Sequence, residues 1–370
     1  MASARPPQPP FLNTMRVSHL ESWNQPGETK ARTVTCVASS TDWIAVNMQK
    51  PPDSIVDYAW EVVVYRRSAK EESVQDTPVH VTRQRPGRLA APHYMDISED
   101  AVLAIAVYPM GVRYFVLGSP VGPVTEPRVV ELPVTTGDPI GVCKFIDLAT
   151  ATRAMVGFAS YPDKKVESIN VYSNVTKSST ATVLATHHHG SISGFDAAPG
   201  IIVVLVAEEQ MLYLLRLVDG DQFSMTQLNL LQLAHSRPAM GLMQPCGVAA
   251  CRDTFVIGYK PAIVTSEGMG LVEVFSTESG QMIARRGLPG ALPTGLALSG
   301  RRVLVGTCLI GHKDRIVHIF HADQPDNFAI GRGISDYAIE NKNLAMTASR
   351  WCFGMNSEVQ TGEVSLSAVM

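Results

Sequence analysis

Short apolar runs alternate with polar and glycine-containing gaps along most of the chain. Runs rich in Val and Ile, bounded by polar or turn residues, are typical of β-strands. The 3.6-residue period of an amphipathic helix is weak throughout. The runs come in pairs, and each pair has the pattern of a β-hairpin. Seven such pairs follow one another at intervals of about 45–60 residues, over 41–67, 100–119, 152–174, 199–219, 253–280, 301–322 and 349–370.

A hairpin that recurs at this spacing indicates a repeat architecture in which each unit buries its faces against its neighbours. We therefore predict an all-β fold, a seven-bladed β-propeller of the WD-repeat-like kind with four-stranded antiparallel blades. Residues 1–30 are expected to form a flexible Pro-rich tail and residues 31–370 a single propeller. The closing sequence GEVSLSAVM (362–370) is expected to pair with the first blade and remove an open edge. A pair of β-sandwiches is the alternative, but it would not predict seven similar hairpins.

Bulk composition narrows the classes of function. The 370 residues carry a formal net charge of −3, which argues against a nucleic-acid protein held by bulk electrostatics. No apolar stretch reaches the roughly 20 residues that span a bilayer, and the N-terminal MASARPPQPPF lacks the apolar region of a signal peptide. The six cysteines are scattered without a CxxC pair and are expected to be reduced. The expected compartment is the cytosol.

The stretch MIARRGL (282–288) places two adjacent charges in an apolar surrounding just after the strand-like LVEVF (271–275). Neighbouring side chains on a strand point to opposite faces of the sheet. At a blade edge, Arg285 and Arg286 can therefore serve two separate clefts. A guanidinium presents a planar fork of donors that matches phosphate oxygens.

The longer stretch GMGLVEVFSTESGQMIARRGLPGALPTGLALSGRRVLVGTCLIGHKDRIVHIFHA (268–322) resembles the junction of the fifth and sixth blades in the PROPPIN family, the phosphoinositide-binding WD-repeat-like β-propellers of autophagy. The resemblance covers about 55 residues and departs from the family at Ala284, where Leu or Phe is usual. The stretch between His235 and the strand at 271 is also longer than usual. The matching residues are Val274–Phe275, Ser279–Gly280, Arg285–Arg286–Gly287 and Val317–His318–Ile319–Phe320, with weaker matches at Ala234–His235–Ser236 and in SRWCFGM (349–355).

The resemblance implies a propeller that binds phosphatidylinositol 3-phosphate and phosphatidylinositol 3,5-bisphosphate. Such a propeller recruits partner proteins, through its faces, to autophagic, endosomal or vacuolar/lysosomal membranes. Arg285 and Arg286 would each anchor one head group, and Gly287 would let the backbone leave the strand or approach a ligand closely. The residues that could complete the two pockets are His235, by the Ala-His match, and Thr307 and His312 in the turn region of the next blade. The alternative is that the two arginines form a solvated rim, or an ion pair with Glu273 or Glu278.

Two weak pockets need a second membrane signal, because single anchors bind marginally. The resemblance implies a membrane-inserting loop of blade six, and residues 323–350 have the place and length for it. The residues expected to insert are Phe328, Ile330, Ile334 and Tyr337. The alternative for this segment is a further strand of the blade.

Other chemistry finds little support in the sequence. His187, His188 and His189 are adjacent and cannot all face one metal ion, so no metal site is expected there. A nucleophile elbow, a P-loop and a zinc-protease motif are all lacking, and we expect neither a cofactor nor an enzyme. The second hypothesis is a WD-repeat-like propeller scaffold that holds a multiprotein complex without binding lipid.

Overall fold

The structure, a computed structural model, describes the greater part of the C-terminal half of the chain and separate strands of the N-terminal half. The described residues are 15–16, 33–49, 60–66, 80–84, 94–98, 102–107, 111–116, 128–130, 143–147, 153–161, 166–173, 182–218, 222–230, 243–263, 268–312, 314–334, 341–347, 350–355 and 358–363. Apart from a short 3₁₀ turn, η3 (Asn341–Asn343), the described elements are β-strands.

The strands of the first half range from two to nine residues in length. They are β1 (Met15–Arg16), β2 (Thr33–Ser39), β3 (Trp43–Gln49), β4 (Trp60–Arg66), β5 (His80–Gln84), β6 (Tyr94–Ile97), β7 (Val102–Val107), β8 (Gly111–Val116), β9 (Arg128–Val130), β10 (Cys143–Asp147), β11 (Arg153–Tyr161), β12 (Val166–Ser173) and β13 (Thr182–His189).

The strands of the second half are β14 (Gly194–Ala198), β15 (Ile201–Val206), β16 (Met211–Leu217), β17 (Phe223–Asn229), β18 (Met243–Ala250), β19 (Thr254–Pro261), β20 (Met269–Ser276), β21 (Met282–Pro289), β22 (Ala291–Ser299), β23 (Arg302–Leu309), β24 (Asp314–His321), β25 (Gln324–Ile334), β26 (Leu344–Met346), β27 (Arg350–Met355) and β28 (Glu358–Glu363).

These described strands form seven four-stranded antiparallel sheets. Six of them are simple meanders in chain order, such as β2-β3-β4-β5 and β18-β19-β20-β21. Each of the seven hairpins expected from the sequence supplies the two middle strands of one sheet, from β3–β4 at the start to β27–β28 at the end. The prediction of an all-β propeller with four-stranded antiparallel blades is confirmed.

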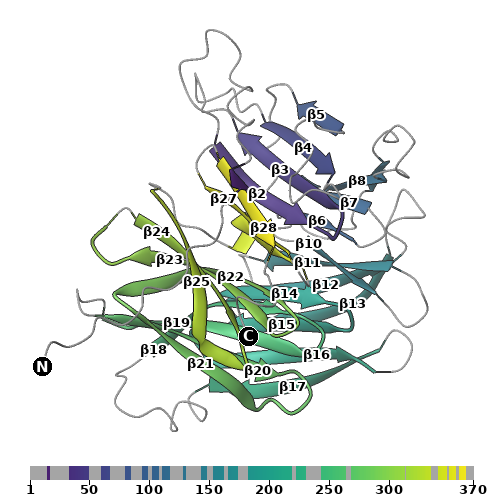
Figure 1. The fold of residues 1–370 in the computed structure, drawn as a ribbon. Coiled ribbons are helices and arrows are strands. Elements are labelled where there is room, and N and C mark those ends of the chain that lie inside the picture. Colours follow the sequence, from purple (N-terminus) through teal and green to yellow (C-terminus); the bar gives the residue numbers. More distant parts are fainter. Residues whose placement is uncertain are drawn as a thin grey trace, which may run out of the picture.

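The first strand of each sheet lies on the inside of the ring. β2, β6, β10, β14, β18, β22 and β26 each contact the first strand of the next sheet, and β26 contacts β2 again. In Figure 1 the colours follow the blades from purple β2 through teal β14 to green β22, and yellow β27 lies beside purple β2. The blades therefore meet around a central channel, and the fourth strand of each blade lies at the outer rim.

The last sheet combines both ends of the described chain, because its order is β1-β28-β27-β26. Met15 pairs with Thr361 and Arg16 with Gln360. The ring is thus closed by an N-terminal strand added to the last blade, whereas the sequence analysis expected the C-terminal strand to pair with the first blade. β1 also falls within the range 1–30 expected to be a flexible tail, so that expectation is wrong for these two residues.

Apolar side chains fill the spaces between blades, because alternate residues of a strand face the two neighbouring blades. On β20, Leu271 and Phe275 pack in a cluster with β14–β16, whereas Val272 and Val274 pack in a cluster with β22–β24. Each blade in this region therefore has one apolar face toward each neighbour, which is why no blade is stable alone.

Two further expectations concern cysteines and membrane spans. Cys36, Cys246, Cys251, Cys308 and Cys352 are not in disulfide bonds; Cys36 and Cys352 are buried and the other three are half-buried. Among the described residues, no helix is long and apolar enough to cross a membrane.

Candidate functional site

Arg285 and Arg286 lie in the middle of β21, the outermost strand of its blade. Arg285 pairs with Glu273 of β20, on the face that β20 turns toward the preceding blade. Arg286 faces the following blade, together with its strand neighbours Ala284 and Leu288. The two arginines thus diverge onto opposite faces of one rim strand, as the sequence predicts.

Arg285 forms a two-point ion pair with Glu273. Its Nε–H donates to Oε1 of Glu273 at 2.9 Å, and its Nη2 lies 2.9 Å from the same oxygen as an ion-pair contact. The Glu273 side chain is 1% exposed, whereas that of Arg285 is 26% exposed. One of the alternatives left open by the sequence, an ion pair with Glu273, therefore describes Arg285. The guanidinium has further N–H donors beyond this pair.

Arg286 is buried between its own blade and the next, with 8% of the residue exposed. Its Cζ lies 3.5 Å from the ring centre of Phe328 on β25 and 5.5 Å from that of Phe320 on β24. Its Nη1–H donates to the Pro325 carbonyl. Burial lowers the pKa of Arg286 to about 10, and the Asp326 carboxylate partly opposes that shift. Arg286 remains a cation at neutral pH and is not a solvated rim residue.

His318 of β24 completes the surroundings of Arg286. It is 8% exposed, and its ring centre lies 5.9 Å from that of Phe328. Burial, and next the Arg286 charge, lower the pKa of His318 to about 4. Neither ring nitrogen of His318 has a hydrogen-bond partner among the described residues, and neither has Nε of Arg286. The seam between the two blades, defined here by Arg286, His318, Phe320 and Phe328, therefore holds a buried cation and several unused polar atoms.

We expect His318 to make the stability of the protein depend on pH. Its pKa is about 4 in the folded protein against 6.5 as its ordinary value, so the unfolded chain binds more protons between these pH values. The free energy of unfolding therefore falls as pH drops from 6.5 to 4, by up to about 3 kcal/mol from this group. Urea denaturation across this range should show a flatter pH dependence for His318→Phe than for wild type. Parallel profiles for the two proteins would contradict this assignment.

Gly287 also lies inside β21, opposite Leu271, and the strand continues to Pro289. The expectation that the backbone leaves the strand here is therefore wrong. A Cβ on Gly287 would stand 2.9 Å from Sδ of Met269. In this structure, the absence of a side chain at Gly287 therefore makes room for the side chain of Met269.

The other residues expected to complete the pockets are not brought to the arginines. Thr307 is buried within β23, not in a turn, and its hydroxyl donates to the Ile316 carbonyl of the same blade at 2.9 Å. His312 is exposed in the turn between β23 and β24. Among the described contacts, none joins either residue to Arg285 or Arg286. His235 lies outside the described residues.

The expected membrane loop over 323–350 is wrong for most of its length. Residues 324–334 form β25, and residues 344–346 form β26. Phe328 packs against the apolar cluster between two blades, and Ile330 and Ile334 are positions of the same strand. Tyr337 lies outside the described residues. The alternative, a further strand of the blade, describes this segment.

Sequence reasoning missed His318 as a site residue, although it is part of the VHIF sequence. The alternation along the strand could have indicated it, because His318 and Phe320 are two residues apart and therefore lie on the same face of the sheet.

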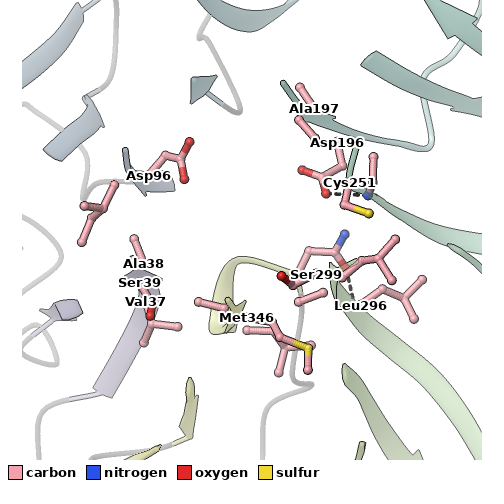
Figure 2. Close-up of a pocket in the computed structure, with 18 of the residues that line it drawn as sticks. Val37, Ala38, Ser39, Asp96, Asp196, Ala197, Cys251, Leu296, Ser299 and Met346 are labelled. Carbon is pink, nitrogen blue, oxygen red and sulfur yellow. Dashed lines mark hydrogen bonds between the residues drawn. The ribbon is translucent and has the colours of Figure 1, made fainter. Parts of the chain in front are cut away.

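Sequence reasoning also missed a cavity of about 290 Å³ at the mouth of the channel, where the inner strands end. Figure 2 shows Asp96 and Asp196 on two of its sides.

Two polar side chains of this cavity, Asp196 and Asn341, join blades. Asp196 accepts the backbone N–H of Ala250 at 2.9 Å, as the dashed line beside Asp196 in Figure 2 marks. The Asn341 side chain accepts a hydrogen bond from Leu296 N and donates one to Val248 O, both at 2.8 Å. Asn341 belongs to η3, the turn before the last blade, and it thus links the blades of β18 and β22. These bonds give the cavity lining a structural role in holding the inner strands together.

The three adjacent histidines lie at the end of a blade. They form the end of β13, where His189 pairs with Glu167, His188 with Ser168 and His187 with Ile169. The next blade begins at Gly194. Among the described residues, no group of three or more potential ligands is placed to hold a metal ion.

Comparisons with known proteins identify the fold. No family model matches the chain, and no curated protein matches it either. Solved structures of similar fold include U3-55K, with 12% identity, a TM-score of 0.56 and coverage of 96% of this chain and 100% of that chain. Sqt1 of Chaetomium thermophilum, bound to the N-terminus of ribosomal protein L10, has 10% identity, a TM-score of 0.53 and coverage of 90% and 97%.

The Dos1 propeller is similar to the same extent, with 10% identity, a TM-score of 0.51 and coverage of 91% of this chain and 93% of that chain. At such identities the likeness concerns the fold alone. Together with the ring of four-stranded sheets, it shows that this chain has a β-propeller fold.

Proposed function

We propose that the chain is a phosphoinositide-binding propeller adaptor whose head-group sites lie on the two faces of β21. The observation that carries the proposal is the seam beside Arg286. There, a buried guanidinium stands next to a neutral histidine, and the unused polar atoms of both lack partners among the described residues. A buried polar atom without a partner costs stability. A phosphate group offers the negative charge and the oxygen acceptors that would offset that cost.

The second site would use Arg285 on the opposite face. Its pairing with Glu273 fixes the guanidinium at the rim and leaves part of it exposed. The N–H donors that do not contact Glu273 are available to phosphate oxygens on the face toward the preceding blade. Two weak sites on one rim favour membranes over single soluble ligands, because both can bind at once.

The resemblance to the PROPPIN family supplies the finer part of the proposal. The ligands would be phosphatidylinositol 3-phosphate and phosphatidylinositol 3,5-bisphosphate, on autophagic, endosomal or vacuolar/lysosomal membranes facing the cytoplasm. The chain would act as a binding protein without enzymatic activity, and its propeller faces would hold partner proteins.

Vesicle co-sedimentation tests the proposal. We expect the wild-type protein to pellet with phosphatidylcholine vesicles only when they contain phosphatidylinositol 3-phosphate. Arg286→Gln should lose most of this pelleting. Arg301→Gln is the matched control, because Arg301 is an exposed arginine that pairs with Asp323 in a turn of the neighbouring blade. Equal pelleting with and without the phosphoinositide would contradict the proposal.

A protein scaffold without lipid binding is the second candidate. The observation in its favour is that both arginines already have internal contacts, Arg285 with Glu273 and Arg286 with Phe328. Sqt1, of similar fold, is described in complex with the N-terminus of a ribosomal protein. A wild-type protein that ignores phosphoinositide vesicles but co-purifies with a stable protein partner would favour this candidate.

A further inference from the structure

The strand β25 does not follow a regular ladder where it passes Arg286. His321 of β24 pairs with Gln324, but the preceding residue Phe320 already pairs with Phe328. Residues 325–327 are therefore extra residues on β25 that have no counterpart on β24. Such a bulge lacks part of the ladder's backbone hydrogen bonds and can rearrange at lower cost than a paired segment.

This bulge and the residue after it provide the contacts that cover Arg286. The Pro325 carbonyl accepts from Nη1, and the Phe328 ring lies 3.5 Å from Cζ. Arg286 is only 8% exposed as a result of its place in the seam, although it belongs to an outer strand. His318 lies beside the same ring.

We propose that Pro325 and Phe328 form an internal cover over Arg286, which an anion must displace before it reaches Arg286 and His318. This inference rests on the proposed function and adds a regulation to that site. A carbonyl oxygen and an aromatic face are both electron-rich partners for a guanidinium, so they occupy Arg286 in the way that a phosphate would. The protein with its cover in place is therefore the low-affinity state of this site.

The apparent affinity of the site is its intrinsic affinity multiplied by the fraction of molecules in which the cover is displaced, so a cover that is mostly in place lowers it. Any event that draws β25 outward would raise the affinity without adding a contact to the ligand. The opposite face, where Arg285 contacts Glu273, has no part in this competition. The two sites are thus expected to differ in affinity, with the Arg285 site accessible first.

A chemical test of the cover needs no lipid. Phenylglyoxal modifies accessible arginines, and mass spectrometry of peptides measures the rate at each one. We expect Arg286 of the intact wild-type protein to react severalfold more slowly than the exposed Arg252. Phe328→Leu keeps an apolar side chain but removes the ring, and it should speed the reaction of Arg286 severalfold. Phe223→Leu, the same change on the outer strand β17, is the control for general loosening and should leave Arg286 unchanged.

A binding test separates this inference from the proposed function. Calorimetric titration with inositol 1,3-bisphosphate should give Phe328→Leu a dissociation constant roughly two- to thirtyfold lower than wild type at the Arg286 site, the range expected from losing a cation–π contact. The cover is overturned if Arg286 reacts as fast as Arg252 in wild type, or if Phe328→Leu changes neither reactivity nor affinity. If Phe328→Leu exposes Arg286 to phenylglyoxal but neither protein binds the head group, the cover stands and the proposed function is overturned.

Discussion

Replacing Arg285 by alanine is expected to lower the free energy of unfolding by about 3 kcal/mol, because it removes the cation from a buried carboxylate. Glu273 is 1% exposed, so water cannot replace Arg285 as its partner. Glu273→Gln should cost less, about 1 kcal/mol, because Arg285 is 26% exposed and its charge can reach water. Urea denaturation measures both effects.

The double variant Glu273→Gln/Arg285→Met is the control for this prediction. It removes both charges and keeps two side chains of similar length, and replacing a buried ion pair as a whole is often close to neutral. We therefore expect the double variant to be more stable than Arg285→Ala. A single Arg285→Ala variant as stable as wild type would show that the ion pair contributes little.

Loss of either arginine site is expected to weaken vesicle binding by about 100-fold, because binding two sites on one membrane multiplies their affinities. The double variant Glu273→Gln/Arg285→Met removes the first site without exposing a buried charge. Arg286→Gln removes the second. Flotation against vesicles of increasing phosphatidylinositol 3-phosphate content measures the apparent affinity of each protein.

The dependence of vesicle binding on the phosphoinositide content of the membrane tests whether the two sites act together. A two-site protein should bind more steeply as the phosphoinositide fraction rises, whereas each one-site variant should bind in simple proportion. If a one-site variant binds vesicles as tightly as wild type, the two arginines do not act together on the membrane.

The sequence predicts the middle strands of the blades well because they contain long apolar runs. A strand such as IIVVLV (201–206) is buried at every position and cannot be mistaken for a turn. Such runs predict the hairpins 199–219 and 253–280. The period of two residues along a strand was also enough to place Arg285 and Arg286 on opposite faces.

The outer strands were harder to predict because one of their edges faces water. β17 has the sequence FSMTQLN and is mostly exposed, so it has no apolar run. β25 begins with the polar QPDN, and its bulge breaks the alternation before Phe328. The resemblance implies membrane contacts for the apolar residues of this segment, whereas Phe328 packs between two blades.

The partners of the two arginines could be predicted only in part. The sequence offers Glu273 and Glu278 as nearby acids for an ion pair, and the register of the two strands places Glu273 directly opposite Arg285. His318 and Phe328 reach Arg286 from another blade, and a contact between blades depends on how the sheets stack. No local pattern in the sequence specifies that stacking.

Stoichiometry of head-group binding tests the central claim most directly, since the claim is that two faces of one strand hold two separate phosphate sites. Calorimetric titration of the wild-type protein with inositol 1,3-bisphosphate should give two sites per chain, and one site after either Arg286→Gln or Glu273→Gln/Arg285→Met. A folded wild-type protein that binds no head group, or a stoichiometry that neither variant changes, would contradict the account.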